Sequence, residues 1–269
     1  MEIIVDLITP FQNNGEIDQK AIEALLEKLL LENAGSVSVN GLAGEAFALS
    51  YEEKKEIIKV VSRYNEYIDI YSGLTESTIE DNLKFVMDTD IFDFKAYIIY
   101  FRQLGCLSPF ELNQYTEELL KLTEKKLILF NDEFADIAFD KLSGRNLEAV
   151  IFQKYQNNFH ELKRFSAENN VKAFLGNERQ LYDCLENRFD GILSSSANFF
   201  YKEFWEIINY DDHERFLIYQ EKLKRIHTKE IPVVIKSLIN EFLFSVGGVR
   251  PPLTDLHFYE KECYFKRIL

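Results

Sequence analysis

The sequence predicts an α/β protein that forms a closed (β/α)8 TIM barrel with a C-terminal helical appendage. Short apolar runs alternate with charged stretches of helical periodicity along most of the 269 residues, a pattern typical of parallel strand–helix units. The number of these runs, eight, suits a closed barrel better than an open sheet. Barrels of this kind often reach about 250 residues as one domain.

The expected strands share a short apolar core bounded by polar residues or glycine. They are Ile3–Ile8, Ser36–Asn40, Ile68–Ser72, Ala96–Tyr100, Leu127–Phe130, Ala149–Gln153, Lys172–Leu175 and Gly191–Ser194. The stretches between them predict helices at Asp18–Glu32, Tyr51–Tyr64, Thr78–Met87, Ser108–Leu122 and Asn158–Ala167.

Local chemistry supports several helix boundaries. Ser50 precedes a helix with Glu53 at its third position, and Asp18 heads another helix in the same manner, so both are expected N-caps. Gly35 is placed to end the first helix in a left-handed conformation. After the eighth strand the pattern is helical, from Lys202 through Ile226 and from Pro232 to about Phe244. We therefore expect a barrel over residues 1–200 and a helical region packed on it over residues 201–269.

The bulk composition narrows the class of partner. A net charge of -14 and a pI near 4.9 argue against nucleic acid and against anionic membrane surfaces. The three cysteines are far apart and the four histidines are scattered, so no disulfide framework or metal site is expected. No signal peptide or long apolar run stands out. The sequence predicts a cytoplasmic protein and leaves small-molecule and protein partners open.

Lys154 is the main candidate for chemistry. It follows the apolar run Ala149–Gln153, at the strand end where barrels of this type carry their reacting groups. Desolvation can lower a lysine pKa from about 10.4 far enough to leave a neutral amine that attacks a carbonyl group. The alternative is a lysine that ends the strand and extends to water.

A glycine loop follows the second expected strand. Gly41 and Gly44 would let backbone N–H groups turn toward a bound anion, although an ordinary strand-to-helix turn has the same composition.

Four segments together resemble the dihydrodipicolinate synthase and N-acetylneuraminate lyase family of class I aldolases. They are Leu7-Ile8-Thr9-Pro10-Phe11, Gly41-Leu42-Ala43-Gly44-Glu45, Asp190-Gly191-Ile192-Leu193-Ser194-Ser195-Ser196-Ala197-Asn198 and Val249-Arg250-Pro251-Pro252-Leu253. The resemblance implies that Lys154 forms a Schiff base with a 2-oxo acid (pyruvate-like) or aldehyde and that no cofactor takes part. In this interpretation Ser195 or a water carries the protons. The resemblance also implies a homo-oligomer, dimer or tetramer. The substrate-binding residues that it implies are Leu42, Ala43, Gly44, Glu45, Phe130, Gly176 and Leu193.

The chain also departs from the family pattern. Phe130 stands where the family has a proton-relaying tyrosine, and a phenyl ring moves no proton. Leu42 and Ala43 replace hydroxyl residues that hold the substrate carboxylate. Tyr100, Glu45 and Ser195 are candidate substitutes, with simple packing as the other interpretation. Three functions stay open: a Schiff-base lyase, a catalytically impaired or non-catalytic protein that binds small molecules or regulates, and a shared fold with an unrelated ligand.

Overall fold

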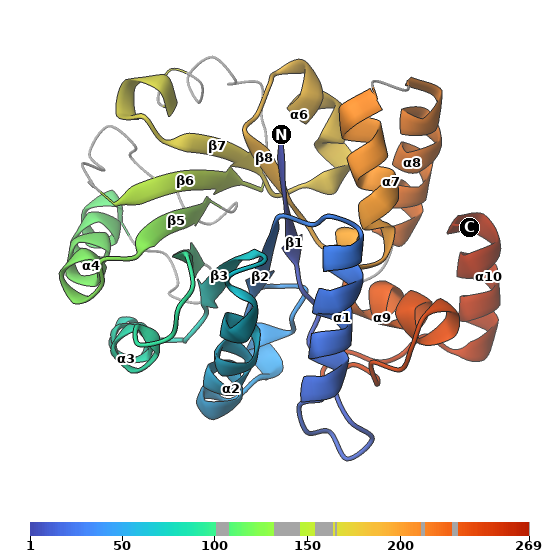
Figure 1. Ribbon diagram of the computed structural model, residues 1–269, viewed down its shortest axis with the longest axis horizontal. Helices are drawn as coiled ribbons and strands as arrows, with labels where there is room; N and C mark the ends of the chain where they lie inside the picture. Colours follow the sequence, from blue (N-terminus) through green and yellow to red (C-terminus); the bar gives the residue numbers. More distant parts are fainter. Residues whose placement is uncertain are drawn as a thin grey trace.

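The protein is a closed barrel of eight parallel strands, paired in chain order with β1 beside β8 (Figure 1). The computed structural model describes residues 1–100, 108–131, 146–153, 164, 166–210, 213–227 and 231–268. The predicted (β/α)8 fold is confirmed. The strands are β1 Glu2–Asp6, β2 Ser36–Val39, β3 Asp69–Leu74, β4 Ala96–Tyr100, β5 Lys126–Asn131, β6 Leu147–Phe152, β7 Lys172–Leu175 and β8 Gly191–Ser194.

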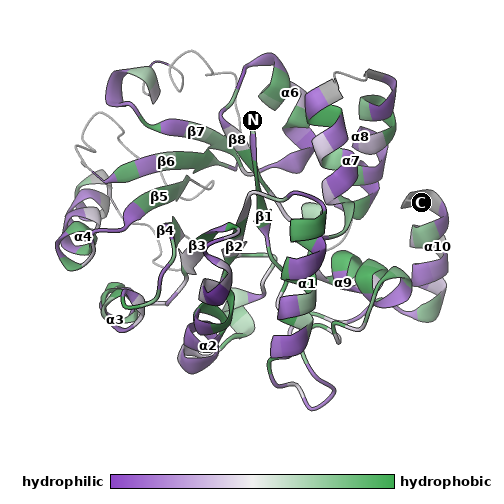
Figure 2. Ribbon diagram, in the orientation of Figure 1, coloured by the Kyte–Doolittle hydropathy of each residue, from purple (hydrophilic) through white to green (hydrophobic). Residues whose placement is uncertain are grey.

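Helices surround the barrel and turn their apolar faces toward the strands (Figure 2). Each apolar face follows the 3.6-residue period expected of a helix that covers a core. The α-helices are α1 Gln19–Leu31, α2 Tyr51–Val61, α3 Ile79–Thr89, α4 Pro109–Leu122, α6 Leu181–Glu186, α7 Ala197–Tyr210, α8 His213–Ile226, α9 Ile231–Phe242 and α10 Phe258–Ile268. Short 3-10 helices are η1 Ala46–Ala48, η2 Ser62–Tyr64 and η5 Glu178–Gln180.

The predicted helix starts are confirmed, and one predicted end is wrong. Ser50 and Glu53 form a reciprocal capping box at α2, and the Asp18 side chain accepts the N–H of Ala21 at α1. At the end of α1 the left-handed residue is Asn33, with φ 63°, rather than Gly35. Asparagine tolerates this conformation, so the chain turns two residues earlier than the glycine indicates. The helix predicted at Asn158–Ala167 lies largely outside the described residues.

The helical region after β8 differs in detail from the prediction. The stretch from Lys202 to Ile226 contains most of α7 and all of α8, and α10 lies in the expected helical region although its own bounds were not predicted. α10 packs beside α8, and α9 lies against α7 and α8 (Figure 1). The expected division at residue 200 falls inside α7 and stays a prediction.

The core has two layers because successive strand residues face opposite sides of the sheet. On β1, Ile3 and Val5 pack under the helices, whereas Ile4 joins a separate cluster inside the barrel. Asp6 has the same parity as Ile4, so the strand directs it inward. The other members of the inner cluster are Tyr71, Ala96, Ile98, Tyr100, Ile128, Phe130, Ala149, Ile151, Phe174 and Leu193.

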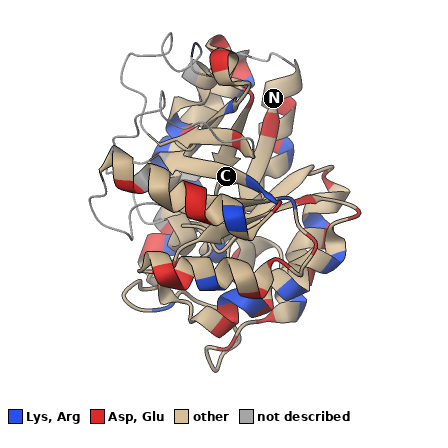
Figure 3. Ribbon diagram, turned by 90° about the vertical axis from the view of Figure 1, so that its left-hand side faces the viewer, with Lys and Arg blue, Asp and Glu red and all other residues tan. Residues whose placement is uncertain are grey.

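Acidic and basic residues are mixed along the outer helices (Figure 3). Within the described ranges, no helix combines the length and apolarity needed to cross a bilayer.

Candidate active site at the barrel mouth

The C-terminal ends of the strands form a mouth with aromatic and apolar walls. Tyr100 at the end of β4 and Phe130 near the end of β5 face inward, with ring centroids 4.7 Å apart. Leu42 from the loop after β2 packs against the same inner cluster, which includes Leu193 of β8. Three predicted substrate-binding residues, Leu42, Phe130 and Leu193, are therefore brought together. Their contact with a substrate stays a prediction.

Asp6 places a buried carboxylate in this mouth. Its side chain is 2% exposed. Oδ2 accepts the backbone N–H of Ala43 at 2.9 Å, and Oδ1 accepts the Ser38 hydroxyl at 3.2 Å. Burial raises the pKa of Asp6 to about 6, the Ala43 and Ser38 hydrogen bonds lower it, and the charge of Glu178 raises it further. No lysine or arginine in the described part of the chain pairs with Asp6.

Two glycines make the close approach of Asp6 possible. A Cβ on Gly41 would overlap Oδ1 of Asp6 and would lie 3.0 Å from the Tyr100 hydroxyl. A Cβ on Gly44 would lie 3.0 Å from the Leu7 carbonyl oxygen. The loop after β2 thus turns an amide toward a carboxylate, as its glycines predict. That carboxylate belongs to the chain itself.

Tyr100 supplies a phenol at the mouth, the same type of side chain as the family's tyrosine that Phe130 replaces. Burial and the nearby Asp6 carboxylate raise the pKa of Tyr100 well above its ordinary value. The phenol therefore stays protonated and can donate a hydrogen bond at the mouth. The Tyr100 hydroxyl lies beside Gly41 of the glycine loop, and its role in proton transfer stays a prediction.

Glu45, the last residue of the glycine loop, has its carboxylate engaged elsewhere. It adopts a left-handed conformation with φ 55°. Its Oε1 lies 2.5 Å from Nζ of Lys236, with both side chains 1% exposed, and its Oε2 accepts the N–H of Arg250 at 2.8 Å. Burial lowers the pKa of Lys236 to about 8 even though Glu45 favours the charged form. These contacts hold the glycine loop to the segment after α9.

Gly176 leaves room at the end of β7. A Cβ at this position would lie 2.8 Å from Oε1 of Gln153 and 3.3 Å from the Phe130 ring. The strand ends of β5, β6 and β7 therefore converge on this glycine. Lys154, the residue after Gln153, lies outside the described residues.

Ser195 follows β8 and touches both carboxylates of the mouth. Its backbone N–H, like that of Ser196, donates to Oε1 of buried Glu178. Its hydroxyl lowers the pKa of Asp6 through a hydrogen bond. Burial raises the pKa of Glu178, but His227, whose Nε2 lies 3.4 Å from Oε2, and Ser196 outweigh it and hold the pKa below its usual range. Ser195 is thus positioned between two acids.

Sequence reasoning missed Asp6 and Lys236, whereas Glu178 falls among the polar residues expected where the seventh strand ends. The alternation of Ile3 and Val5 with Ile4 contained a signal for Asp6, because it assigns residue 6 to the barrel interior. No comparable signal identifies Lys236, whose partner Glu45 is remote in sequence. In the described ranges, no three His, Cys, Asp or Glu side chains are grouped to hold a metal ion.

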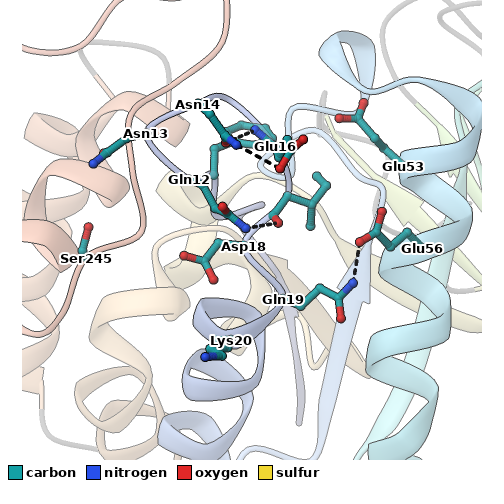
Figure 4. A pocket seen from close by; sticks show the side chains of 12 residues that line it. Gln12, Asn13, Asn14, Glu16, Asp18, Gln19, Lys20, Glu53, Glu56 and Ser245 are labelled. Atoms are coloured by element: carbon teal, nitrogen blue, oxygen red, sulfur yellow. Dashed lines mark hydrogen bonds between the residues drawn. The ribbon is translucent and has the colours of Figure 1, made fainter.

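A separate hollow lies outside the barrel mouth, beside the loop that joins β1 and α1 (Figure 4). It has a volume of about 1050 Å³ and is open to solvent. Four of its polar side chains form two hydrogen-bonded pairs: Asn14 Nδ2 donates to Glu16 at 2.9 Å, and Gln19 Nε2 donates to Glu56 at 2.5 Å. The hollow therefore offers no buried, unpaired group to a ligand.

Fold and mouth together define a (β/α)8 barrel protein with two buried carboxylates and a phenol at the C-terminal ends of its strands. The chain belongs to the dihydrodipicolinate synthetase family, whose model matches residues 1–268. It is 24% identical to 4-hydroxy-tetrahydrodipicolinate synthase of Streptococcus uberis, over 100% of this chain and 92% of that protein.

Two further relatives carry other names. The chain is 23% identical to 2-dehydro-3-deoxy-phosphogluconate/2-dehydro-3-deoxy-6-phosphogalactonate aldolase of Saccharolobus solfataricus, over 99% of this chain and 94% of that protein. The structure of Proteus mirabilis N-acetylneuraminate lyase superposes with a TM-score of 0.84 at 18% identity, covering 99% of this chain and 97% of that one. The relatives are thus lyases, aldolases and synthases of one family, and this chain is a divergent member.

Proposed function

We propose that the protein is a Schiff-base lyase or aldolase that acts through Lys154 on a small carbonyl compound, a 2-oxo acid or an aldehyde. The observation that carries the proposal is the end of β6. Gln153 lies there against Gly176, at the mouth that Phe130 also lines, and Lys154 is the next residue in the chain. Membership of a family with aldolase and lyase relatives supports the same chemistry.

The reaction begins when the lysine nitrogen adds to the carbonyl carbon and gives a carbinolamine. Loss of the former carbonyl oxygen as water then leaves an imine. In its protonated form the imine accepts the electron pair of the bond between its α and β carbons and becomes an enamine. The β-hydroxyl loses its proton as this bond breaks, and the β carbon leaves as an aldehyde; the reverse direction forms the bond. Each step moves protons. Ser195, which touches Asp6, is the proposed proton carrier on the described part of the mouth.

Borohydride trapping tests this proposal. The protein is incubated with a carbonyl compound, reduced, and analysed by intact mass and peptide mapping. We expect one adduct, on Lys154, and no adduct in Lys154→Ala. Lys172→Ala is the matched control, because Lys172 begins β7 at the opposite end of the barrel and its side chain is 43% exposed. Equal trapping in Lys154→Ala and the parent protein would refute the proposed nucleophile.

A non-catalytic binding or regulatory role is the second candidate. Phe130 favours it, since this buried ring contacts Tyr100 and has no hydroxyl at the position expected for the relay. Trapping without turnover of any aldol substrate would support this role. Self-association as a dimer or tetramer also stays a proposal, and sedimentation analysis measures it directly.

A further inference from the structure

Asp6 occupies the hydrogen-bonding position that the glycine loop offers to an anion. The N–H of Ala43 donates to Oδ2 of Asp6 at 2.9 Å, so this amide already has a carboxylate partner. Gly41 lies so close to Oδ1 that no side chain fits between them. A ligand carboxylate that used the same amide would have to displace Asp6.

The negative charge of the mouth also disfavours a ligand carboxylate. Asp6 and Glu178 are both buried carboxylates, and the charge of Glu178 acts on Asp6. The described hydrogen bonds to the Asp6 carboxylate come from neutral donors: the Ala43 amide and the hydroxyls of Ser38 and Ser195. An incoming anion therefore meets the carboxylate of Asp6, which no described lysine or arginine pairs with, in a region of low dielectric where repulsion is strong.

The remaining walls suit an uncharged molecule. Leu42, Phe130 and Leu193 present apolar surface, and the Tyr100 hydroxyl adds one polar contact beside Asp6. A carboxylate such as Asp6 accepts hydrogen bonds and donates none when ionised. The mouth thus matches a ligand with a hydroxyl group better than one with a carboxylate.

We propose that Asp6 takes the place of the substrate carboxylate, so that the carbonyl substrate is a small neutral aldehyde or ketone rather than a 2-oxo acid. The inference rests on the proposed Schiff-base function for its chemistry. It assigns Asp6 the role of a specificity-determining residue that excludes acids from the Ala43 amide.

Two substitutions of Asp6 distinguish the effect of its oxygen occupying the Ala43 N–H from the effect of its negative charge. Asp6→Asn keeps the shape of the side chain and an oxygen for the Ala43 N–H but removes the charge, whereas Asp6→Ala removes both. Asp93→Ala is the matched control, because Asp93 is exposed and remote from the mouth. Circular dichroism and thermal unfolding verify that each variant folds, and the near-isosteric Asp6→Asn remains available if Asp6→Ala does not.

The probes are pyruvate and hydroxyacetone, which share a methyl ketone and differ in carboxylate against hydroxymethyl. We expect the parent protein to trap hydroxyacetone on Lys154 at least about 10-fold more efficiently than pyruvate. Asp6→Ala should raise pyruvate trapping about 10-fold or more, Asp6→Asn should raise it less, and Asp93→Ala should change neither probe. A parent protein that prefers pyruvate would overturn the inference.

Measuring binding in a protein that cannot form an imine separates the role proposed for Asp6 from the role proposed for Lys154. Calorimetry in a Lys154→Met background measures pyruvate affinity where no Schiff base forms. The added Asp6→Ala should tighten pyruvate binding about 10-fold or more, and this gain without any trapping would refute the nucleophile while supporting the role of Asp6. No gain in affinity, or no pyruvate binding by either protein, would refute the role of Asp6 whatever the lysine does.

Discussion

Two buried carboxylates at either side of the glycine loop, Glu45 and Asp6, have opposite surroundings. Glu45 pairs with Lys236 and accepts an N–H from Arg250. Asp6 has neutral donors from Ala43 and Ser38 and the charge of Glu178 nearby. The first arrangement compensates a buried charge and joins distant segments. The second retains a charge at an energetic cost, which is typical of functional sites.

The largest effect is expected from breaking the compensated pair. Lys236→Met leaves Glu45 buried without its cation, so the free energy of unfolding should fall by about 3–5 kcal/mol. Urea denaturation measures the change. The matched control is Lys224→Met, because the exposed Lys224–Glu221 pair should contribute at most about 1 kcal/mol. Equal losses in the two variants would contradict the structural role of the buried pair.

Asp6→Asn should change the free energy of unfolding in the opposite direction from Lys236→Met. The pKa of Asp6 is raised from 3.8 to about 6 by burial, so the folded state holds this proton more tightly than the unfolded state. The stabilisation that results is complete below about pH 4 and is lost as the pH rises through 6. At pH 8 the substitution should therefore stabilise the protein by about 1–3 kcal/mol. Below pH 4 it should bring no such gain.

Urea denaturation at pH 8 and pH 4 provides this comparison, with Asp93→Asn as an exposed control. A loss of stability in Asp6→Asn at pH 8 would mean that the ionised carboxylate stabilises the fold.

A hydroxyl added to the mouth tests what limits its chemistry. Phe130→Tyr should raise the rate of imine formation by up to roughly 10²-fold, because a phenol can move the protons that a phenyl ring cannot. Stopped-flow measurement gives the rate. Phe130→Leu is the control and should stay near the parent rate. Identical rates in the tyrosine variant and the parent, at equal ligand affinity, would show that another group already carries the proton.

The smallest change in stability is expected from the partly exposed ion pair between Glu53 and Arg250. Glu53 pairs with Arg250, and this hydrogen bond lowers the pKa of Glu53 to about 2. Its stabilising contribution is present above about pH 4.5 and is lost as the pH falls toward 2. Because both side chains are partly exposed, Glu53→Gln should cost only about 1 kcal/mol at pH 7. Thermal unfolding at pH 7 and pH 2.5 should show the difference between variant and parent shrinking at the lower pH.

Much of the fold was predictable because hydrophobic periodicity acts locally. The strands lie within a few residues of their predicted positions, and the Ser50 and Asp18 caps formed as expected. The exceptions are also local. Asn33 took the left-handed conformation expected of Gly35, and the bounds of α10 were not predicted within the expected helical region.

The site was predictable only in part. The glycine loop, Phe130 and Leu193 were placed at the mouth by strand order, and the structure brings them there. The partners of Asp6 and Glu45 were not predictable, because a buried charge is stabilised or opposed by groups far away in the sequence. The alternation of inward-facing and outward-facing residues along β1 could have placed Asp6 in the barrel interior. Treating Ile3–Ile8 as a single apolar strand left that alternation unused.

The contact between the glycine loop and the segment after α9 also has a bearing on how the protein is made. Glu45 and Arg250 are 205 residues apart, and the N–H of Phe11 donates to the carbonyl of Val246. A ribosome adds roughly 5–20 residues per second, so the loop waits roughly 10–40 s for these partners. During translation, Glu45 exists without Lys236 or Arg250. A nascent chain stalled before residue 236 would therefore contain the sequence of all eight strands with a loop that is still unanchored and accessible to chaperones.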